Sequence, residues 1–284
     1  MTLLRALLFN IAFFLGTVVI GIAGLTALLM PRRIVMAFGR WWARYVLASL
    51  KLIVGLDGEI RGRDNIPPGA CLIAMKHQSA WDTLILPVLL GDPAVVIKRE
   101  LLFVPFYGWY AARAGSIFID RKGGAPALRR MLAAARAAVA AERPIVIFPE
   151  GTRTPPGTKL VYQPGVAALY QALDVPLVPA AVNSGLFWGR RSFAKRPGRI
   201  VLSFLPPIPP GRPRREIMGL IEQRIEAETA ALEREAGLTI ERDGKIFRHP
   251  RASGGPAASD AAVALDTSPG LIQGSRGNDD ATSR

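Results

Sequence analysis

The chain between Gly58 and Leu205 alternates short apolar runs with helical segments, and this alternation constrains the fold more than any other feature of the sequence. The runs are apolar throughout, which is typical of strands that are covered on both faces. The strand candidates are Leu72–Met75, Ala94–Ile97, Ser116–Ile119, Ile145–Phe148, Leu177–Val182 and Ile200–Leu205. The helix candidates between them are Trp81–Leu90, Leu101–Arg113, Ala125–Glu142 and Val166–Leu173. This order predicts an α/β domain with a largely parallel sheet flanked by helices.

The N-terminal run from Ala6 to Met30 contains no charged residue and is rich in Leu, Ile, Val and Phe. At about 25 residues it is long enough to cross the core of a bilayer as a helix. A cleaved signal peptide is the alternative, but the run is longer than such a peptide needs and no small-x-small cleavage site follows it cleanly. We therefore predict an N-terminal helical membrane anchor.

A second stretch, Ile34–Leu56, mixes basic and aromatic residues with apolar ones. Arg40 and Arg44 are four residues apart and share one face of a helix. Tryptophan and tyrosine rings suit the headgroup layer of a membrane, because one end of the ring can remain solvated. We predict an interfacial helix that completes an anchor over residues 1–56; an amphipathic helix packed on the domain is the alternative.

Basic residues follow the first apolar run at Arg32 and Arg33 and recur through the next stretch. An excess of Arg and Lys beside a membrane segment marks the cytoplasmic side. We therefore expect the rest of the chain on the cytoplasmic face of a membrane, which we take to be a bacterial inner membrane.

The composition limits the classes of partner and of site. The 284 residues have a formal net charge of +14, and half of them are apolar. Nucleic acid, anionic lipid and phosphorylated substrates are all attracted to a basic protein. Because the chain has a predicted anchor, we expect the phospholipid bilayer as a partner and no nucleic acid. The single cysteine, Cys71, excludes an internal disulfide and a multi-cysteine metal site, and we expect it to be buried.

The C-terminal part divides at two places. A proline-rich break, Pro206–Pro210, is followed by a charged helix over about Arg214–Glu235. Beyond Pro250 the chain is rich in Ser, Gly, Ala, Pro and Asp, a composition typical of disorder. We therefore predict a folded domain over residues 57–248 and a disordered tail over residues 249–284.

His77 and Asp82 form the first candidate site, directly after the predicted strand Leu72–Met75. A histidine with a carboxylate partner can take a proton from a hydroxyl group. In one straight helix a separation of five residues places two side chains about 140° apart. The pair can therefore meet only if His77 lies in the turn before the helix. The alternative is structural, because Ser79 and Asp82 also fit a capping box.

A second candidate block, Phe148–Thr154, follows another predicted strand. Gly151 permits close approach of a ligand to the backbone, Thr152 can donate a hydrogen bond, and Arg153 offers a planar fork. This combination suits a phosphate group. The alternative is a polar turn with a local ion pair between Glu150 and Arg153.

Further basic residues are expected at the same edge of the sheet. Lys98 and Arg121 each follow a predicted strand. Open α/β sheets bind ligands at the carboxyl ends of their strands, so both side chains are expected on the same edge as His77. The alternative for Arg121 is an ion pair with Asp120 that only keeps the strand end soluble.

A basic cluster with interleaved aromatic residues lies between the last two predicted strands. Its members are Arg190, Arg191, Lys195, Arg196 and Arg199, with Phe187, Trp188 and Phe193 among them. The composition resembles a patch that binds a membrane surface or nucleic acid, and a solvated loop is the alternative.

Several sequence patterns are absent, and their absence narrows the chemistry. The chain has no Gly-x-Ser-x-Gly elbow, which argues against a serine hydrolase. It has no Walker-type loop and no Gly-x-Gly-x-x-Gly fingerprint. Two widely separated histidines and one cysteine argue against a zinc site. We therefore expect His77 to activate a hydroxyl of the substrate itself, with no metal and no bound cofactor.

Four segments in this order resemble the 1-acyl-sn-glycerol-3-phosphate acyltransferases (lysophosphatidic acid acyltransferases), within the glycerolipid acyltransferase family. The signature consists of His-x4-Asp, Gly-x-x-Phe-Ile-x-Arg, Glu-Gly-Thr-Arg and Val-Pro-x-x-Pro. In this chain the corresponding segments are His77 to Asp82, Gly115–Arg121, Glu150–Arg153 and Val175–Pro179. The resemblance covers about half of the chain. It departs from the family at Lys76, where Asn is common, and at Ala80, where a bulky residue is common.

The resemblance implies a role for each block. His77 is the expected general base and Asp82 its orienting partner. Arg121 and the block Glu150, Gly151, Thr152 and Arg153 are expected to hold the glycerol phosphate, with Lys98 beside them. Pro176 and Pro179 are expected to help form the acyl or catalytic pocket.

The implied reaction is acyl transfer from acyl-CoA or acyl-carrier protein to the sn-2 hydroxyl of lysophosphatidic acid, which gives phosphatidic acid for phospholipid biosynthesis. The alternatives are transfer to another lysolipid such as lyso-ornithine lipid, or to glycerol 3-phosphate. A non-enzymatic module that binds anionic lipid or nucleic acid through the basic cluster is the alternative from another class.

Overall fold

The computed structural model describes residues 2–121, 123–240 and 246–248. Residues Met1–His249 form one compact unit, which is the subject of the following paragraphs. The predicted tail, residues 249–284, lies outside the described residues.

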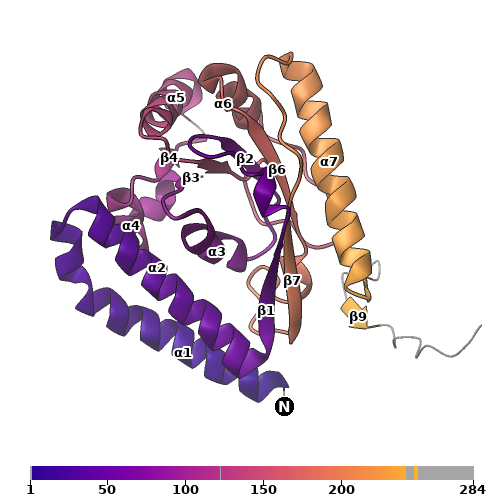
Figure 1. Ribbon diagram of the computed structural model, residues 1–284. Coiled ribbons are helices and arrows are strands. Elements are labelled where there is room, and N and C mark those ends of the chain that lie inside the picture. Colours follow the sequence, from indigo (N-terminus) through magenta and orange to yellow (C-terminus); the bar gives the residue numbers. More distant parts are fainter. Residues whose placement is uncertain (1, 122, 241–245, 249–284) are drawn as a thin grey trace, which may run out of the picture. The chain divides into compact units, whose positions relative to one another are not determined.

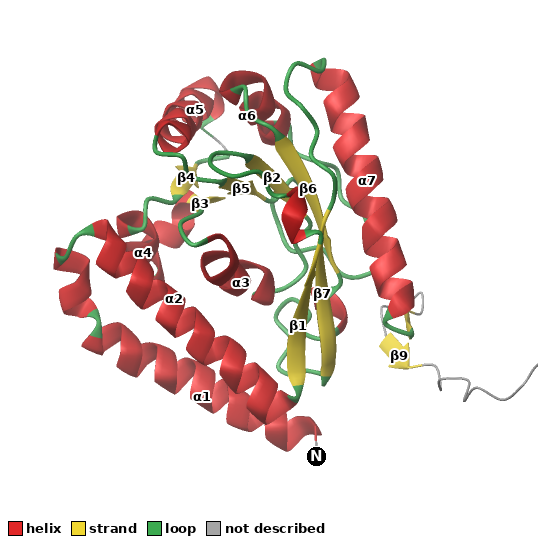
Figure 2. Ribbon diagram, viewed as in Figure 1, coloured by secondary structure: helices red, strands yellow, loops and turns green. Residues whose placement is uncertain are grey.

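A seven-stranded sheet forms the centre of this unit, with the strand order β1-β7-β6-β2-β5-β3-β4 (Figures 1 and 2). Its strands are β1 (Leu56–Arg61), β2 (Leu72–Met75), β3 (Ala94–Lys98), β4 (Ile117–Ile119), β5 (Ile145–Ile147), β6 (Leu177–Val182) and β7 (Gly198–Phe204). Every neighbouring pair is parallel except β6 and β7, which are antiparallel. The prediction of an α/β fold with a largely parallel sheet is confirmed.

The parallel strands β6, β2, β5, β3 and β4 all end at one edge of the sheet. In the centre, Leu72 of β2 lies opposite Ile145 of β5 and Leu177 of β6. Because the strands are neighbours and run the same way, the segments that follow them meet at this carboxyl edge. Residues from distant parts of the chain are thereby brought together.

The strand β1 and a short hairpin, β8 (Leu238–Ile240) with β9 (Ile246–Arg248), were not predicted. In β1, apolar and charged residues are mixed, as at Asp57, Glu59 and Arg61. This strand lies at the edge of the sheet and is half exposed, so it lacks the continuous apolar run of the central strands.

Helices cover both faces of the sheet (Figure 2). One face carries α5 (Gly124–Ala140), α6 (Gly165–Leu173) and α7 (Arg214–Glu235), and the other carries α3 (Trp81–Leu90). The predicted single helix Leu101–Arg113 is wrong, since the chain forms a 3-10 turn, η4 (Arg99–Phe103), and then α4 (Tyr107–Arg113). The break lies at Pro105 and Phe106, and Phe106 has a positive φ of 61° that no helix accommodates.

The alternating side chains of β2 divide the core into two layers. Ile73 and Met75 pack in the cluster that contains Trp81 of α3, whereas Leu72 and Ala74 pack in the cluster that contains Met131 of α5. Successive side chains of a strand point to opposite faces, so an all-apolar strand requires a helix layer on each side. Each fully buried large apolar side chain contributes about 1.5–3 kcal/mol relative to exposure.

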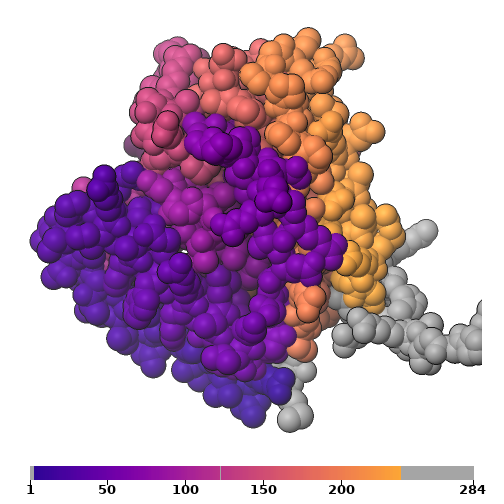
Figure 3. Space-filling model, in the orientation of Figure 1, coloured from indigo at the N-terminus to yellow at the C-terminus, as the bar shows by residue number. Residues whose placement is uncertain are grey.

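Two N-terminal helices lie outside α3 on the same side of the sheet (Figure 1). They are α1 (Thr2–Ala23), followed by a 3-10 turn, η1 (Leu25–Leu29), and α2 (Arg32–Ser49), which continues as a π-helical turn, η2 (Leu50–Val54). The first helix therefore ends earlier than the predicted run Ala6–Met30. The space-filling view shows these segments (indigo and violet) against the body of the protein (Figure 3).

One side of α1 is docked and the other is exposed. Phe9 is buried against Trp188, and the Tyr45 hydroxyl of α2 donates a hydrogen bond to the Ala12 carbonyl (3.0 Å). The outer side presents a row of exposed apolar residues that includes Leu4, Leu8, Ile11, Phe14, Leu15, Val18, Val19 and Ile22. The segment Leu3–Ala23 is long and apolar enough to cross a membrane, so a membrane anchor is plausible from its composition.

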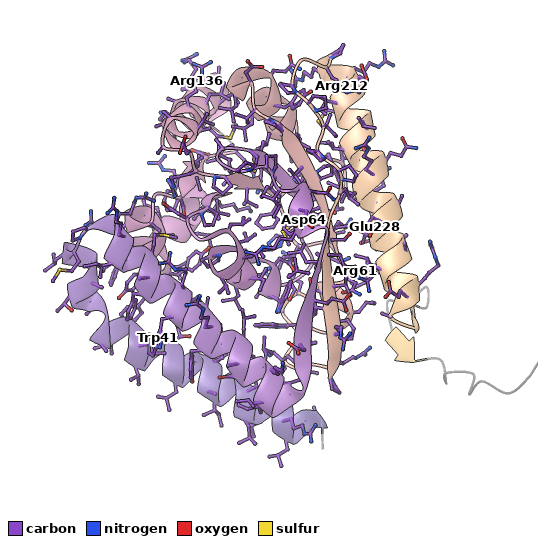
Figure 4. The ribbon with its side chains drawn as sticks, in the orientation of Figure 1. Trp41, Arg61, Asp64, Arg136, Arg212 and Glu228 are labelled. Atoms are coloured by element: carbon purple, nitrogen blue, oxygen red, sulfur yellow. The ribbon has the colours of Figure 1, made fainter. Side chains whose placement is uncertain are left out.

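The second helix, α2, has a clear buried face. Val35, Ala43 and Val46 are buried, while Trp41 is 53% exposed on the outer side (Figure 4). The packed amphipathic helix weighed as an alternative is therefore present in the fold. An interfacial role for its exposed side stays a prediction.

Candidate active site

A cavity of about 740 Å³ opens at the carboxyl edge of the sheet. The predicted site residues that line it are His77, Lys98, Arg121, Gly151, Thr152 and Arg153. These residues come from the ends of β2, β3, β4 and β5, which are consecutive strands in the sheet order β2-β5-β3-β4. The fold thus brings the expected base and the expected phosphate ligands to one cavity.

His77 lies in the turn between β2 and α3, as the spacing requires if it is to meet Asp82. Its Nδ1 atom is 2.9 Å from Oδ2 of Asp82. The helix α3 begins at Trp81, so Asp82 sits in the first turn and points back over the preceding loop. The imidazole and the carboxylate are almost completely buried, with 11% and 0% of their side chains exposed.

The Asp82 carboxylate has several donors besides the imidazole. Its Oδ2 atom accepts the backbone N–H groups of Gln78 (2.7 Å) and Ser79 (2.8 Å). Its Oδ1 atom accepts the hydroxyl of Ser184, in the segment after β6. Asp82 therefore satisfies loop amides at the start of the helix, as a capping residue does, and also holds the imidazole.

The imidazole ring is held flat against Phe148, with ring centroids 4.0 Å apart and an interplanar angle of 23°. The hydrogen bond of the ring to Asp82 uses its Nδ1 atom. A neutral imidazole that donates Nδ1–H to a carboxylate presents its lone pair at Nε2. Because His77 lines the cavity, the arrangement can accept a proton from a hydroxyl group placed there.

A buried ion cluster lies behind His77. The Nζ atom of Lys76 is 2.6 Å from Oε1 of Glu150 and 2.8 Å from Oε1 of Glu226, which projects from α7. The other oxygen of Glu150 accepts the backbone N–H of His77 (3.2 Å). The Lys76 and Glu150 side chains are both 0% exposed. Lys76, one of the departures from the family pattern, thus supports the backbone that carries the imidazole.

The opposite wall of the cavity is cationic. The Arg121 guanidinium lies against Gly151, so close that a β-carbon there would lie 2.8 Å from its central carbon. Gly151 also has a φ of +70°, which favours glycine. Partial burial lowers the pKa of Arg121, with Glu100 acting in the opposite direction, and the guanidinium remains charged. A partly desolvated cation attracts an anion more strongly than one in bulk water.

The only cysteine does not contribute a nucleophile. Cys71 is buried at the start of β2 and is not among the residues that line the cavity. Burial raises the pKa of its thiol to about 11, so it stays protonated at neutral pH. Among the described residues, no group of three or more His, Cys, Asp or Glu side chains could hold a metal ion.

Comparison with known proteins agrees with this geometry. Residues 58–183 match the family model described as Acyltransferase. The chain is 37% identical over 159 residues to a 1-acyl-sn-glycerol-3-phosphate acyltransferase of Pseudomonas aeruginosa, covering 56% of this chain and 62% of that protein. It is 32% identical over 169 residues to the human 1-acyl-sn-glycerol-3-phosphate acyltransferase alpha, covering 58% and 60%. The similarity to acyltransferases thus covers residues 58–183, the part of the chain that carries most of the cavity lining.

A similar fold is found in a solved structure, described as the 1-acyl-sn-glycerophosphate (LPA) acyltransferase PlsC from Thermotoga maritima. The two chains align with a TM-score of 0.68 and 22% identity, over 82% of this chain and 98% of that one. At this identity the likeness establishes the fold alone. The matched region spans about three fifths of the length of the curated relatives.

Three predicted site residues, Glu150, Pro176 and Pro179, do not line the cavity. Glu150 is turned into the ion cluster behind His77 and so does not face a phosphate. Pro176 and Pro179 flank and enter β6, where their carbonyls accept hydrogen bonds from Leu72 and Leu205 (both 2.9 Å). The two prolines shape the central strand and its neighbours, and they are not among the residues that line the cavity.

Several residues that hold the candidate site were not predicted from the sequence. The Gln78 amide donates to Glu233 of α7 (2.8 Å) and accepts the N–H of Gly185 (3.0 Å). Ser184 and Glu226 were also not foreseen. Ser184 could have been suspected, because it follows a central strand at the carboxyl edge. Glu226 and Glu233 are seven residues apart on one helix face, but nothing in the sequence says which strand that face covers.

Proposed function

We propose that the chain transfers an acyl group from a thioester donor, acyl-CoA or acyl-carrier protein, to the sn-2 hydroxyl of lysophosphatidic acid, forming phosphatidic acid. One observation carries the proposal. A single cavity holds the imidazole of His77, oriented by Asp82, together with the cationic side chains of Arg121 and Arg153. A base and an anion-binding wall in one cavity suit an acceptor that carries both a hydroxyl and a phosphate.

In the proposed reaction, Nε2 of His77 takes the proton of the acceptor hydroxyl as its oxygen attacks the thioester carbonyl. The carbon–sulfur bond then breaks, and the leaving thiolate takes the proton back from the imidazolium. The Asp82 carboxylate holds the ring in the required tautomer and stabilises its transient positive charge. General base catalysis supplies about 10²–10⁴-fold, so positioning of the two substrates must supply much of the remainder.

Phosphate recognition would do this positioning for the acceptor. Arg121 and Arg153 offer planar forks, Lys98 adds a point charge, and Thr152 adds a hydroxyl. The support is their shared cavity with His77 and the contact of Arg121 with Gly151. The 1-acyl-sn-glycerol-3-phosphate acyltransferase names of the relatives agree with such an acceptor.

The test uses the full-length chain in membranes, a long-chain acyl-CoA and a panel of lysolipids with and without phosphate. His77→Ala should lower turnover by at least about 10²-fold while the protein still folds. Free thiol and phosphatidic acid are measured together. Arg136→Ala is the control, because this exposed arginine lies on α5 outside the cavity (Figure 4). A His77→Ala variant with full activity would exclude this base.

Replacement of a residue that binds the phosphate should change the acceptor KM, in contrast to His77→Ala, which should lower turnover. Arg153→Ala should raise the apparent KM for lysophosphatidic acid by about tenfold or more, because a charge-assisted contact is lost. Lyso-ornithine lipid and glycerol 3-phosphate serve as competing acceptors in the same assay. An unchanged acceptor KM would remove Arg153 from the phosphate site.

We also propose that residues 1–56 anchor the acyltransferase domain, residues 57–248, to a membrane. The exposed apolar row on α1 and the exposed Trp41 on α2 support this proposal. We place the domain on the cytoplasmic face of a bacterial inner membrane, where the excess of Arg and Lys after α1 would lie. Protease protection of sealed vesicles tests the sidedness, and cleavage only from the periplasmic side would contradict it.

A further inference from the structure

The cavity carries more positive charge than one acceptor phosphate requires. Its basic residues are Lys98, Arg121, Arg153, Arg190, Arg191 and Arg214, and Asp120 is the only described acidic residue in its lining. A phosphate monoester carries a charge of about −1.5 to −2 at neutral pH. Lys98, Arg121 and Arg153 already balance such a group.

The remaining cations of the lining include Arg190 and Arg191, which come from a different part of the chain. In the sheet, β6 and β5 are the two neighbours of β2. His77 follows β2 and Arg153 follows β5, whereas Arg190 and Arg191 belong to the segment that follows β6. The cavity that contains the imidazole therefore receives cations from the segments that follow both neighbours of β2. Acyl transfer brings two substrates to the base. The cations that follow β5 can therefore bind one substrate, and those that follow β6 can bind the other.

No described carboxylate forms an ion pair with Arg190 or Arg191. Both side chains are exposed and line the cavity. Arg191 also has a φ of +57°, a conformation that is uncommon outside glycine. Such backbone conformations persist only where the surroundings hold them, and they concentrate at ligand sites.

The segment that carries the two arginines is held from both ends. Before it, Phe187 and Trp188 are buried. After it, the buried Lys195 places its Nζ atom 2.6 Å from Oδ1 of Asn10 in α1 and 5.3 Å from the centre of the Trp188 ring. The loop is therefore pinned, and its arginines can meet an anion with little additional loss of freedom.

We propose that Arg190 and Arg191 form a second anion subsite, which binds the pyrophosphate and 3′-phosphate of coenzyme A when it carries the acyl group. The assignment rests on the proposed function, because it names the donor for the same base. An acyl-carrier protein would dock on a broad surface of roughly 800 Å² per partner. Two adjacent arginines at the wall of a cavity fit a compact polyanion such as a nucleotide.

The test compares the double variant Arg190→Ala/Arg191→Ala with the wild-type full-length chain. The KM for acyl-CoA should rise at least about tenfold, because contacts to charged groups are lost. The KM for lysophosphatidic acid should not change. Acyl-pantetheine, which lacks the nucleotide phosphates, should be used equally by variant and wild type. Arg190→Lys/Arg191→Lys should restore part of the affinity for acyl-CoA.

The matched control is Arg129→Ala/Arg136→Ala, which removes two exposed arginines of α5 outside the cavity. Direct binding of free coenzyme A to the detergent-solubilised protein gives a readout that does not depend on the acceptor. If the wild-type protein binds coenzyme A through these arginines but acylates no lysophosphatidic acid, the proposed function fails and the subsite stands.

Three results would overturn the subsite. An unchanged KM for acyl-CoA removes the two arginines from donor binding. If the KM rises for acylated acyl-carrier protein and not for acyl-CoA, Arg190 and Arg191 bind a protein donor. Weaker binding to vesicles of anionic phospholipid, with coenzyme A binding unchanged, assigns them to the membrane surface.

Discussion

Two buried lysines in this protein are held in opposite ways. Lys76 lies behind His77, with Glu150 and Glu226 around its ammonium group. Lys195 lies on the side of α1, where its ammonium group is bonded to Asn10 and to the Phe193 carbonyl (3.0 Å) and has no carboxylate partner among the described residues. Both residues are buried, at 0% and 2% exposure.

The comparison shows that the stability of the fold depends more on the charge of Lys76 than on the charge of Lys195. At Lys76, removal of one partner leaves the others charged and out of water, so the cluster is stable only as a whole. At Lys195, amide and carbonyl dipoles and the faces of Phe9, Trp188 and Phe193 replace hydration. Burial without a counter-ion lowers the pKa of Lys195 to about 8. The first lysine supports the turn that carries His77, and the second joins the N-terminal helix to the domain.

Replacement of each lysine by methionine compares the two positions, and Lys76→Met is expected to have the larger effect on stability. Lys76→Met should lower the free energy of unfolding by about 3–5 kcal/mol, because Glu150 is left as a buried, unpaired charge. Turnover should also fall, since Glu150 accepts the backbone N–H of His77. Denaturant unfolding of the detergent-solubilised protein measures the first effect, and thiol release measures the second.

A second variant tests the cause of that loss. Lys76→Met with Glu150→Gln removes both charges of the buried pair and should recover part of the stability. The exposed Lys51→Met, whose lysine pairs with Asp57 at the surface, serves as the control and should change stability by less than about 1 kcal/mol. If the double variant is as unstable as Lys76→Met alone, the unpaired charge is not the reason.

Lys195→Met should have a smaller effect, below about 2 kcal/mol at pH 7. The methionine keeps the contacts with Phe9 and Trp188 and removes a desolvated charge, while Oδ1 of Asn10 loses its donor. Denaturant unfolding of Lys195→Met and Lys76→Met under the same conditions compares the losses in the free energy of unfolding. Equal losses at the two positions would contradict the distinction between them.

The smallest effect is a pH dependence that belongs to Lys195 alone. Between pH about 8 and its ordinary value of 10.5, the folded protein holds this amine neutral while the unfolded chain binds a proton. The unfolded state therefore binds more protons, and stability relative to Lys195→Met should rise with pH through this window. Below pH 8 both states are protonated and the difference should be flat. A difference that stays flat from pH 8 to pH 10 would show that burial does not lower the pKa of Lys195.

Much of the sheet could be predicted because its central strands are apolar on both faces. Leu72–Met75 and Leu177–Val182 are strands with the predicted bounds. The cavity residues His77, Arg121 and Arg153 could be placed at one edge for the same reason, since parallel strands end together. The contacts that support them could not be predicted. Lys76 meets Glu226 across 150 positions of sequence, and Lys195 meets Asn10 across 185, so both depend on how the helices dock.

The glycines of the N-terminal segment, in α1 and directly after it, show which route can make the protein soluble for study. Side chains from α2 fill the space beside two of them, with Tyr45 against Gly16 and Phe38 against Gly24. Deletion of α1 would uncover these aromatic rings and Trp188, and the shortened chain should precipitate. Polar substitutions at the outward positions, such as Leu8, Leu15 and Val19, leave every one of those contacts in place and are the better route to a detergent-free protein.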